Sequence, residues 1–517
     1  MLWDIPEKLT HAEQRLVKKV RKRSQFFVFL REIRHLLFDD AFQAELCAAY
    51  QPRGQEPVPP ALLAMVMLLQ AYTGLSDASA VDEAEMDLRW QLVLGTLGKG
   101  EAPFGQGTLS RFRARVIEHE LDRRLLERTV ELAKQTGAFG WKQLRVAFDS
   151  SPLRGAGRVE DTWNLIGRAM SKLVAVLARL TDVPDDEIIE EAGLTLLQGP
   201  SIKATLDIDW DDREARSDAL LLVLEQAEAL LSWVHDHAQE VLEEPRVAEA
   251  TKLLERIIAQ DTEPDPNRPK RKQILRGVAV DRVCSVGDPE MRHGRKSKTK
   301  AFNGYKRHVA TLLDAPLILD AQARPANEPE HESAAGLLEG VTAFGTLVEL
   351  YIDRGYLGSD KITELYRSGV RVHCRPWPEP NRPGKLGRED FKVDLRRKVV
   401  QCPAGIEAPI RASDRIAIFG DACATCKLAP QCTDAKQGRG FRVSDQESLL
   451  RRLRREAKSK RGREGLRARV KVEHRLARVG QFQGRAARYR GVRKNTLDLR
   501  RHCAVANLCE LRGALAA

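Results

Sequence analysis

The 517-residue sequence lacks the features of membrane, secreted and repeat proteins. No apolar run approaches the roughly 18 residues that a membrane-spanning helix needs. The first 26 residues are rich in Lys, Arg and Glu and contain no apolar segment typical of a signal peptide. The chain also contains no internal repeat and no low-complexity tract. These absences predict a cytoplasmic protein with no membrane partner.

Cysteine is scarce, and its nine residues form an odd number. Without a secretion signal, such a set predicts thiols that are buried, free or metal-bound in a reducing compartment. Hydrophobic residues make up 43% of the sequence and charged residues 31%, which excludes a disordered chain. The length predicts about two to four domains.

Charge is unevenly distributed along the chain. The net charge is +12 and the pI is near 9.3, which favours a polyanionic partner. Residues 182–265 contain 23 acidic and 6 basic side chains, whereas residues 451–500 contain 19 basic and 4 acidic ones. This separation predicts a solvated acidic insertion and a C-terminal segment that faces phosphates.

Two short apolar runs each end in an aspartate. Residues 144–148 precede Asp149, and residues 347–352 precede Asp353. A buried strand with an acidic residue at its C-terminal end is how α/β proteins place carboxylates at the edge of an active site. We therefore expect a mixed α/β sheet in which the two aspartates lie on neighbouring central strands, with Asp149 at the end of its strand.

A third acid, Glu473, lies far downstream in an arginine-rich predicted helix. Phosphodiester transfer uses two metal ions to stabilise the attacking and leaving oxygens, and Mg²⁺ prefers carboxylate ligands. We expect Asp149 to bridge two Mg²⁺ (or Mn²⁺) ions, Asp353 to bind one and Glu473 the other.

Other interpretations of these acids stay open. Both aspartates could simply be turn residues at the ends of strands. Glu473 could be a solvated ion-pair partner of the neighbouring arginines, and Glu456 and Glu464 are alternative third acids. Asp161 is a further alternative, but the pair Asp161-Thr162 is more typical of the start of a helix.

The N-terminal region, residues 1–138, is predicted to be helical. Residues 107–116 begin a helix whose first turns carry three arginines. This pattern favours a helix-turn-helix-like DNA-binding module in which Ser110, Arg111 and Arg113 face the duplex. An ordinary helical bundle with a solvated basic face fits the pattern equally well.

The α/β core is predicted to contain a long helical insertion. Apolar residues recur at helical spacing between residues 219 and 259, and a proline-rich stretch, residues 263–269, is expected to end the insertion. Residues 302–312 and 316–323 predict a β-hairpin. The predicted units are an N-terminal domain (1–138), the start of the core (139–160), an acidic helical insertion (161–280), the continued core (281–395), a cysteine-rich module (396–445) and a basic C-terminal part of the core (446–517).

Several short motifs occur in a specific order. They are Phe148-Asp149-Ser150-Ser151-Pro152, Asp161-Thr162, Asn303-Gly304-Tyr305-Lys306, Asp353-Arg354-Gly355-Tyr356, Val472-Glu473-His474-Arg475, Gly484-Arg485-Ala486-Ala487-Arg488-Tyr489-Arg490-Gly491 and Ala506-Asn507-Leu508. In this order and spacing, the chain resembles the DDE transposases of bacterial insertion sequences.

The resemblance implies an RNase H-like core in which Asp149, Asp353 and Glu473 bind metal. It implies cleavage at the ends of an element, followed by attack of the freed 3′-hydroxyl on target DNA. The implied partner is double-stranded DNA, both element ends and target. A homodimer or a larger assembly on DNA is expected, associated with the bacterial nucleoid.

Basic residues near these motifs are candidate phosphate contacts, which would give affinity rather than sequence choice. Tyr305 and Tyr489 could stack on an unpaired base or belong to the core. The candidate DNA contacts are Arg111, Arg113, Lys296, Lys298, Lys300, Lys306, Arg485, Arg488, Arg490, Arg493 and Lys494.

Four cysteines resemble the ligands of a small zinc module. Cys423 and Cys426 form a CxxC pair, and Cys402 and Cys432 flank it. A Cys₄ site is closed and structural, and Zn²⁺ would supply much of the folding energy of this segment. Free or redox-active thiols are the alternative. The remaining cysteines show no ligand spacing and are expected to be ordinary thiols: Cys47, Cys284, Cys374, Cys503 and Cys509.

Three other functions stay open. A metal-dependent nuclease would hydrolyse DNA without joining strands, and a transposase-derived DNA-binding protein would not cleave at all. A zinc-dependent transcription factor explains the cysteines but leaves the two acid-ended strands without a purpose.

Overall fold

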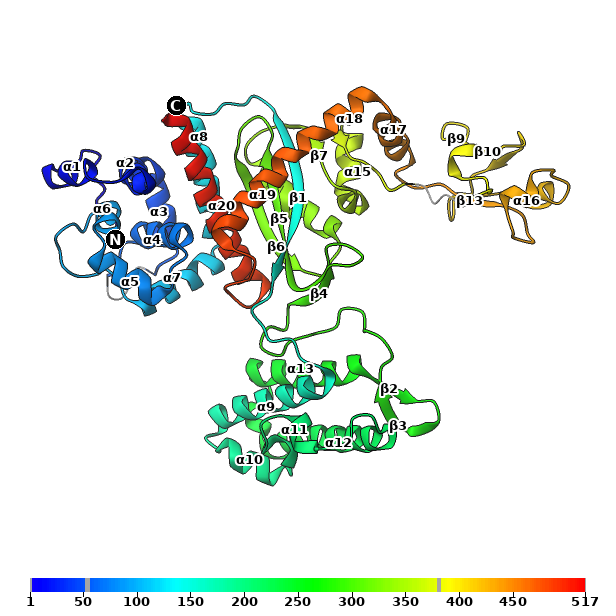
Figure 1. The fold of residues 1–517 in the computed structure, drawn as a ribbon, viewed down its shortest axis with the longest axis horizontal. Coiled ribbons are helices and arrows are strands. Elements are labelled where there is room, and N and C mark those ends of the chain that lie inside the picture. The colour runs from blue at the N-terminus through cyan, green and yellow to red at the C-terminus, as the bar shows by residue number, and fades with distance from the viewer. Residues whose placement is uncertain (1, 52–55, 379–382, 517) are drawn as a thin grey trace.

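The computed structural model describes residues 2–51, 56–378 and 383–516. A central sheet carries helices on both sides, with an insertion on one side and a small arm of short strands on another (Figure 1). The fold is mixed α/β, as the alternation of apolar strands and helical segments predicts.

The N-terminal region is helical throughout its described part. Helix α4 is the most apolar segment; it begins at Pro60, where proline is tolerated, and its side chains are almost all buried. The helices are α1 (His11–Val17), α2 (Gln25–Leu37), α3 (Asp40–Ala48), α4 (Pro60–Thr73), α5 (Asp77–Met86), α6 (Leu88–Leu94), α7 (Gln106–Glu118) and α8 (Leu121–Gln135).

The central sheet has six strands in the order β4-β5-β1-β7-β8, with β6 also paired to β5. β1 is antiparallel to β5 and parallel to β7, so the two predicted aspartate strands are neighbours, as expected. β5 and β6 form the predicted hairpin. The strands are β1 (Leu144–Arg154), β4 (Arg292–Arg295), β5 (Ala301–Leu312), β6 (Ile318–Pro325), β7 (Leu347–Tyr351) and β8 (Arg371–His373).

β1 does not end at Asp149, so the predicted strand end is wrong. The strand continues to Arg154 because β5 keeps pairing with it along that whole length. Pairing with β7, however, stops at Ala147. Asp149 therefore lies where the sheet opens on its β7 side, and Asp353 lies just beyond the end of β7.

The connections after β6 and β7 each contain a short 3₁₀ turn followed by a helix. After β6 these are η4 (Glu330–Ser333) and α14 (Ala334–Thr342). After β7 they are η5 (Arg354–Gly358) and α15 (Asp360–Arg367). The two 3₁₀ turns pack against each other.

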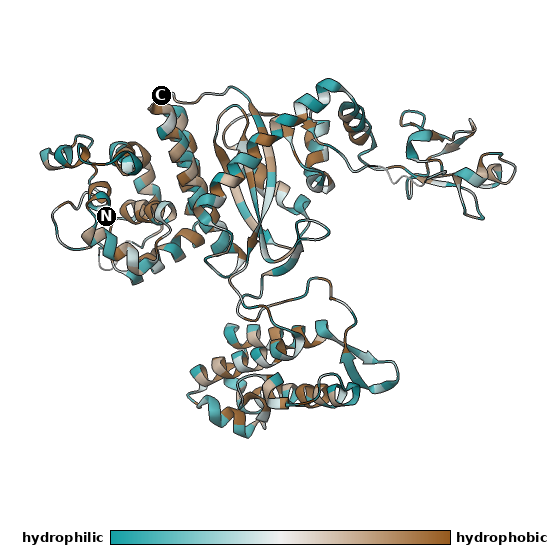
Figure 2. Ribbon diagram, viewed as in Figure 1, coloured by the Kyte–Doolittle hydropathy of each residue, from teal (hydrophilic) through white to brown (hydrophobic). Residues whose placement is uncertain are grey.

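One hydrophobic core joins the N-terminal helices to the sheet. The C-terminal helix α20 (Val492–Leu515) packs against β6, α8 and α4, and most of its residues are buried. Asn507 on α20 bonds to both backbone groups of Ile318, at 2.8 and 2.9 Å, and to Thr129 on α8 at 3.0 Å. Figure 2 shows apolar residues along the facing surfaces of these elements.

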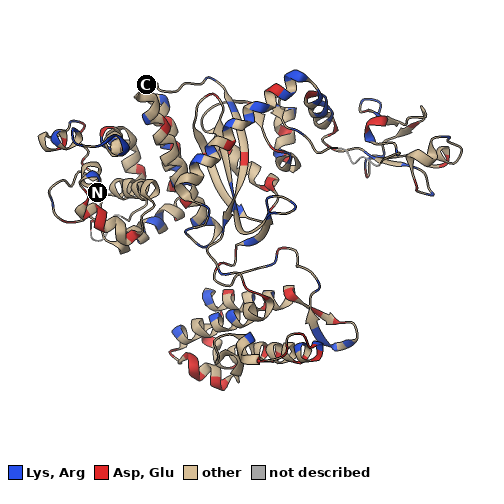
Figure 3. Ribbon diagram, in the orientation of Figure 1, with Lys and Arg blue, Asp and Glu red and all other residues tan. Residues whose placement is uncertain are grey.

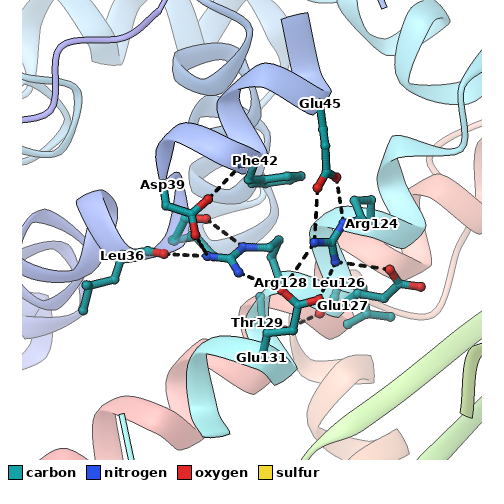
Figure 4. Close-up of polar contacts among 11 residues, drawn as sticks. Leu36, Asp39, Phe42, Glu45, Arg124, Leu126, Glu127, Arg128, Thr129 and Glu131 are labelled. Atoms are coloured by element: carbon teal, nitrogen blue, oxygen red, sulfur yellow. Dashed lines mark hydrogen bonds and ion pairs between the residues drawn. The ribbon is translucent and has the colours of Figure 1, made fainter. Parts of the chain in front are cut away.

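Helix α8 fixes the N-terminal helices by arginine contacts (Figure 4). Arg128 donates to the carbonyl of Leu36 at 2.7 Å and pairs with Asp39 at 2.8 Å. Arg124 pairs with Glu45 at 2.7 Å. The corner between α2 and α3 is thereby tied to α8.

The other face of α8 is tied to the core by buried ion pairs. Asp122 accepts from Arg493 at 2.5 Å and from Arg500 at 3.2 Å, both on α20. Arg123 reaches Asp320 on β6 at 3.3 Å. The N-terminal helices and the sheet therefore form one packed body.

The insertion between β1 and β4 has a hydrophobic core of its own. Asp161 caps its first helix by accepting from the amide of Asn164 at 3.1 Å, as the Asp-Thr pair predicts. The proline-rich stretch, residues 263–269, does not simply end the insertion but forms most of a two-stranded hairpin, in which proline is tolerated because both strands are edges. The elements are α9 (Thr162–Thr181), α10 (Asp185–Glu191), α11 (Ile202–Leu206), α12 (Arg213–His237), α13 (Pro245–Asp261), β2 (Thr262–Asp265) and β3 (Arg268–Ile274).

The arm that follows β8 is built from short strands around a small aromatic core of Phe391, Phe419 and Phe441. Three helices then return to the sheet, and the last of them packs against β1. The elements are β9 (Lys392–Asp394), β10 (Val399–Gln401), β11 (Glu407–Pro409), β12 (Ile416–Ile418), α16 (Ala429–Cys432), β13 (Gly440–Arg442), α17 (Glu447–Lys458), α18 (Lys460–Leu466) and α19 (Val470–Gln483).

Among the described residues, no single helix combines the length and the apolar content needed to cross a bilayer. Within the same ranges, only the consecutive helices α4 and α5 taken together have the length and apolar composition of a membrane span, and a bend of 103° separates them.

Candidate active site

A cavity of about 780 Å³ lies between the sheet and α19. Asp149 on β1, Asp353 after β7 and Glu473 on α19 all line it. The three acids are separated by more than 100 residues in sequence at each step, yet the fold brings them to one cavity.

Asp149 is the most buried of the three acids. Its side chain is 15% exposed, and its Oδ1 accepts from the amide of Ser150 at 2.9 Å. The pKa of Asp149 is raised to about 6, chiefly by burial; the charges of Asp353 and Glu473 contribute to this rise, while Arg469 and the Ser150 amide oppose it. A cation in this cavity would favour the ionised carboxylate.

Asp353 and Glu473 are more exposed, at 45% and 53% of their side chains. Asp353 caps the 3₁₀ turn η5, accepting from the amide of Arg354 at 2.7 Å. Glu473 lies in the first turn of α19, where a helix N-terminus favours a negative charge.

Arg469 lies between two of the acids and was not predicted. Its guanidinium approaches Asp149 Oδ1 at 3.4 Å and Glu473 Oε1 at 3.4 Å. The spacing of four residues to Glu473 was the available signal, because such pairs share a helix face. The adjacent arginines gave the same signal for other pairs, so the sequence alone did not single out Arg469.

A fourth carboxylate, Glu330, also lines the cavity and was not predicted. Ser150, the residue after Asp149, donates from Oγ to Glu330 Oε1 at 2.5 Å. The other oxygen of Glu330 lies against Gly355, two residues after Asp353.

Behind the acids lies a buried hydrogen-bonded group. Tyr356 and Ser333 both contact His308 Nδ1, at 2.8 and 3.0 Å. Burial lowers the pKa of His308 to about 3 and raises that of Tyr356 well above its usual value, so both stay neutral. This group anchors η4 and η5 against β5.

The carboxylate oxygens of the cavity are of the chemical type that binds a hard cation, because Mg²⁺ and Mn²⁺ prefer carboxylate ligands. Within the described ranges, however, no group of three or more His, Cys, Asp or Glu side chains has the arrangement of a metal site. At the cavity, Arg469 stands between Asp149 and Glu473.

The predicted DNA contacts fall into three groups. Lys296, Lys306 and Arg485 line the cavity. Arg113 and Arg493 instead pair within the chain, with Asp77 and with Asp122, so their charges are already satisfied. Lys306 donates to the carbonyl of Glu328 at 2.8 Å. The other candidates are exposed side chains: Arg111, Lys298, Lys300, Arg488, Arg490 and Lys494.

The two tyrosines considered for base stacking differ. Tyr305 is fully buried and donates to Asp288 at 2.5 Å, so it belongs to the core. Tyr489 is half-buried beneath the guanidinium groups of Arg113 and Arg501.

The four predicted zinc ligands also come together. Cys402, Cys423, Cys426 and Cys432 line one hollow of about 20 Å³ in the arm. Burial raises the pKa of the Cys432 thiol, and the other three thiols raise it further. Of the remaining cysteines, Cys47 is half-buried and the rest are buried: Cys284, Cys374, Cys503 and Cys509.

Two family profiles match the chain. Residues 272–508 match the profile described as "Transposase DDE domain", and residues 14–115 match "Transposase domain (DUF772)". No curated protein and no solved structure gives a significant match. The two profiles cover separate segments and both describe transposases. The chain therefore belongs to the DDE transposases of insertion sequences.

Proposed function

We propose that this protein cleaves DNA at the ends of an insertion sequence and joins the freed 3′-hydroxyl to target DNA. Asp149, Asp353 and Glu473 are the carboxylates of its active site, on a core of the RNase H-like type. The observation that supports this most strongly is the shared cavity, which receives the three acids from β1, from the turn after β7 and from α19.

The carboxylates would hold Mg²⁺ or Mn²⁺. Two such ions, when bound, stabilise the attacking and leaving oxygens of a phosphodiester displacement. Asp149 would contact both ions, because it is the most buried of the three acids and the charges of both Asp353 and Glu473 act on it. Arg469 neutralises part of the negative charge on Asp149 and Glu473.

Basic side chains at the mouth of the cavity would position the DNA. Lys296 begins an exposed turn that also carries Lys298 and Lys300, and Arg485, just beyond the end of α19, also lines the cavity. Figure 3 shows Lys and Arg along α17 to α19, and α19 also lines the cavity. Phosphate contacts of this kind fix orientation and add salt-dependent affinity. A homodimer or a larger assembly would hold two element ends.

The cysteine-rich arm is proposed to bind one structural Zn²⁺ through Cys402, Cys423, Cys426 and Cys432. The support is that four thiols from separate turns share one hollow too small for a substrate. The small aromatic core around Phe391 is insufficient on its own for a segment of this size, so metal ligation would add folding energy.

Strand joining tests the proposed activity. The substrate is a duplex that carries the inverted repeats flanking the coding sequence, pre-cleaved to expose a 3′-hydroxyl. With Mg²⁺, we expect joined products on a target plasmid. Hydrolysis without joining would instead identify a metal-dependent nuclease. The absence of both joined and hydrolysed products would identify a DNA-binding protein without catalysis.

A further inference from the structure

Glu330 touches both segments that carry the catalytic aspartates. On one side it accepts the Ser150 hydroxyl at 2.5 Å, directly after Asp149. On the other side it meets the turn η5, which begins directly after Asp353.

The contact between Glu330 and the turn η5 is close at Gly355. A Cβ atom at this position would lie 2.0 Å from Glu330 Oε2 and 2.9 Å from its Cδ. A side chain at residue 355 would therefore displace the Glu330 carboxylate from its present position. The glycine of the Asp-Arg-Gly-Tyr motif is required for this close approach.

The turn that carries Glu330 is itself firmly held. Ser333 bonds to the Glu330 carbonyl at 2.7 Å and to His308 at 3.0 Å. A Cβ at Gly358 would meet the His331 ring at 2.8 Å, so the two 3₁₀ turns are also pressed together at their other end. The turn that carries Glu330 is thus held to β5 through Ser333 and His308, apart from the contacts that the Glu330 carboxylate itself makes.

We propose that Glu330 is a positioning residue that holds Asp149 and Asp353 at a fixed separation. It acts through Ser150 and through the backbone at Gly355, not as a ligand. The carboxylate pair must be held closely because small displacements of reacting groups cost large factors in rate. This inference rests on the proposed function for its catalytic consequence, but its structural content can be measured without catalysis.

The first test compares Glu330→Ala with Glu330→Gln in the full-length protein. Gln keeps the shape and can still accept from Ser150, so cleavage should stay within about threefold of wild type, whereas Ala should lower it about 10- to 100-fold. Glu332→Ala, two residues along the same turn and outside the cavity, is the matched control and should be neutral. Equal loss in Gln and Ala would show that the charge itself acts, as a ligand or a base, and would overturn positioning.

A double-mutant cycle tests the contact with η5. Gly355→Ala alone forces Glu330 aside and should impair cleavage. In the Glu330→Ala background the carboxylate is gone and only the Cβ of residue 330 lies near the new methyl group, at 3.2 Å, so the added effect of Gly355→Ala should be smaller than in the wild type. Independent, additive losses would contradict a contact between the two positions.

Hydrogen exchange gives the readout that does not depend on activity. Peptides covering residues 149–155 and 353–358 should exchange faster in Glu330→Ala than in wild type or Glu330→Gln. Unchanged exchange in both peptides would overturn the proposal. If the wild-type protein does not cleave DNA, the proposed function fails, while the exchange result still decides whether Glu330 braces the two segments.

Discussion

The carboxylate cavity and the cysteine hollow are assembled in similar ways but differ in size and chemistry. The cavity brings together four carboxylates that are distant in sequence, those of Asp149, Glu330, Asp353 and Glu473. The hollow brings together four thiols from separate turns, those of Cys402, Cys423, Cys426 and Cys432. The first is about 780 Å³ and is lined by oxygen donors and basic residues, whereas the second is about 20 Å³ and is lined by thiols and apolar groups. An open site has room for a substrate, and a closed one has room only for an ion. This difference supports the proposed catalytic role of the carboxylate cavity and the proposed structural role of the cysteine hollow.

The largest effect is expected at Asp149. Asp149→Asn removes the most buried carboxylate of the cavity, so cleavage should fall by at least about a thousandfold, equivalent to several kcal/mol of transition-state stabilisation. Binding to DNA should remain, as a mobility-shift assay would show. Asp360→Asn is the matched control, because this exposed residue follows η5 but does not line the cavity. Loss of DNA binding in Asp149→Asn would mean that the residue maintains the fold.

Removal of a zinc-binding cysteine should affect folding, whereas Asp149→Asn should affect catalysis. Cys426→Ser should reduce bound zinc from about one per chain to none and should unfold the arm, because a closed metal site contributes folding energy. Elemental analysis and proteolysis of residues 391–443 check both results. Cys47→Ser, outside the hollow, should change neither. The absence of zinc from purified wild-type protein would contradict the proposed zinc site.

Arg469 should show an intermediate effect. Arg469→Ala leaves Asp149 and Glu473 without their shared guanidinium, so we expect about a tenfold loss of cleavage, smaller than that of Asp149→Asn. Arg469→Lys should retain more activity because the charge remains. Arg463→Ala, on the preceding helix and outside the cavity, serves as the control. If cleavage rose on removal of Arg469, the guanidinium would be an obstacle to metal ions and not a support.

The smallest effect is expected on the exposed turn beside the cavity. Lys298→Ala combined with Lys300→Ala should reduce the salt dependence of DNA affinity by up to about two phosphate contacts, roughly 1.8 in the logarithmic slope. Arg179→Ala with Arg246→Ala removes the same charge from the insertion and is the matched control. An equal change in both double variants would show that only net charge matters, and that the turn makes no specific contact.

Sequence patterns located the carboxylates because each depends on a local feature. Asp149 and Asp353 follow apolar runs that become neighbouring strands, and Glu473 lies in an arginine-rich predicted helix, a position that the resemblance to transposases also implied. The true end of β1 was missed because it depends on how far β5 pairs with it, which is a tertiary property.

Glu330 and Arg469 could not be found in the same way. Glu330 lies on a short 3₁₀ turn, and its importance comes from contacts with residues 180 and 25 positions away. Arg469 is one of many arginines in its segment, and only the packing of α19 against β1 selects it. Likewise, the ion pairs of Arg113 and Arg493 show that a basic residue in a suggestive motif can serve the fold.

The most direct test of the account is calorimetric titration of Mn²⁺ into the full-length protein. The account predicts binding of Mn²⁺ to the wild type that is lost when Asp149, Asp353 and Glu473 are together changed to Asn, Asn and Gln, and that is unaffected by Asp360→Asn. Identical Mn²⁺ binding in the wild type and the triple variant would contradict it.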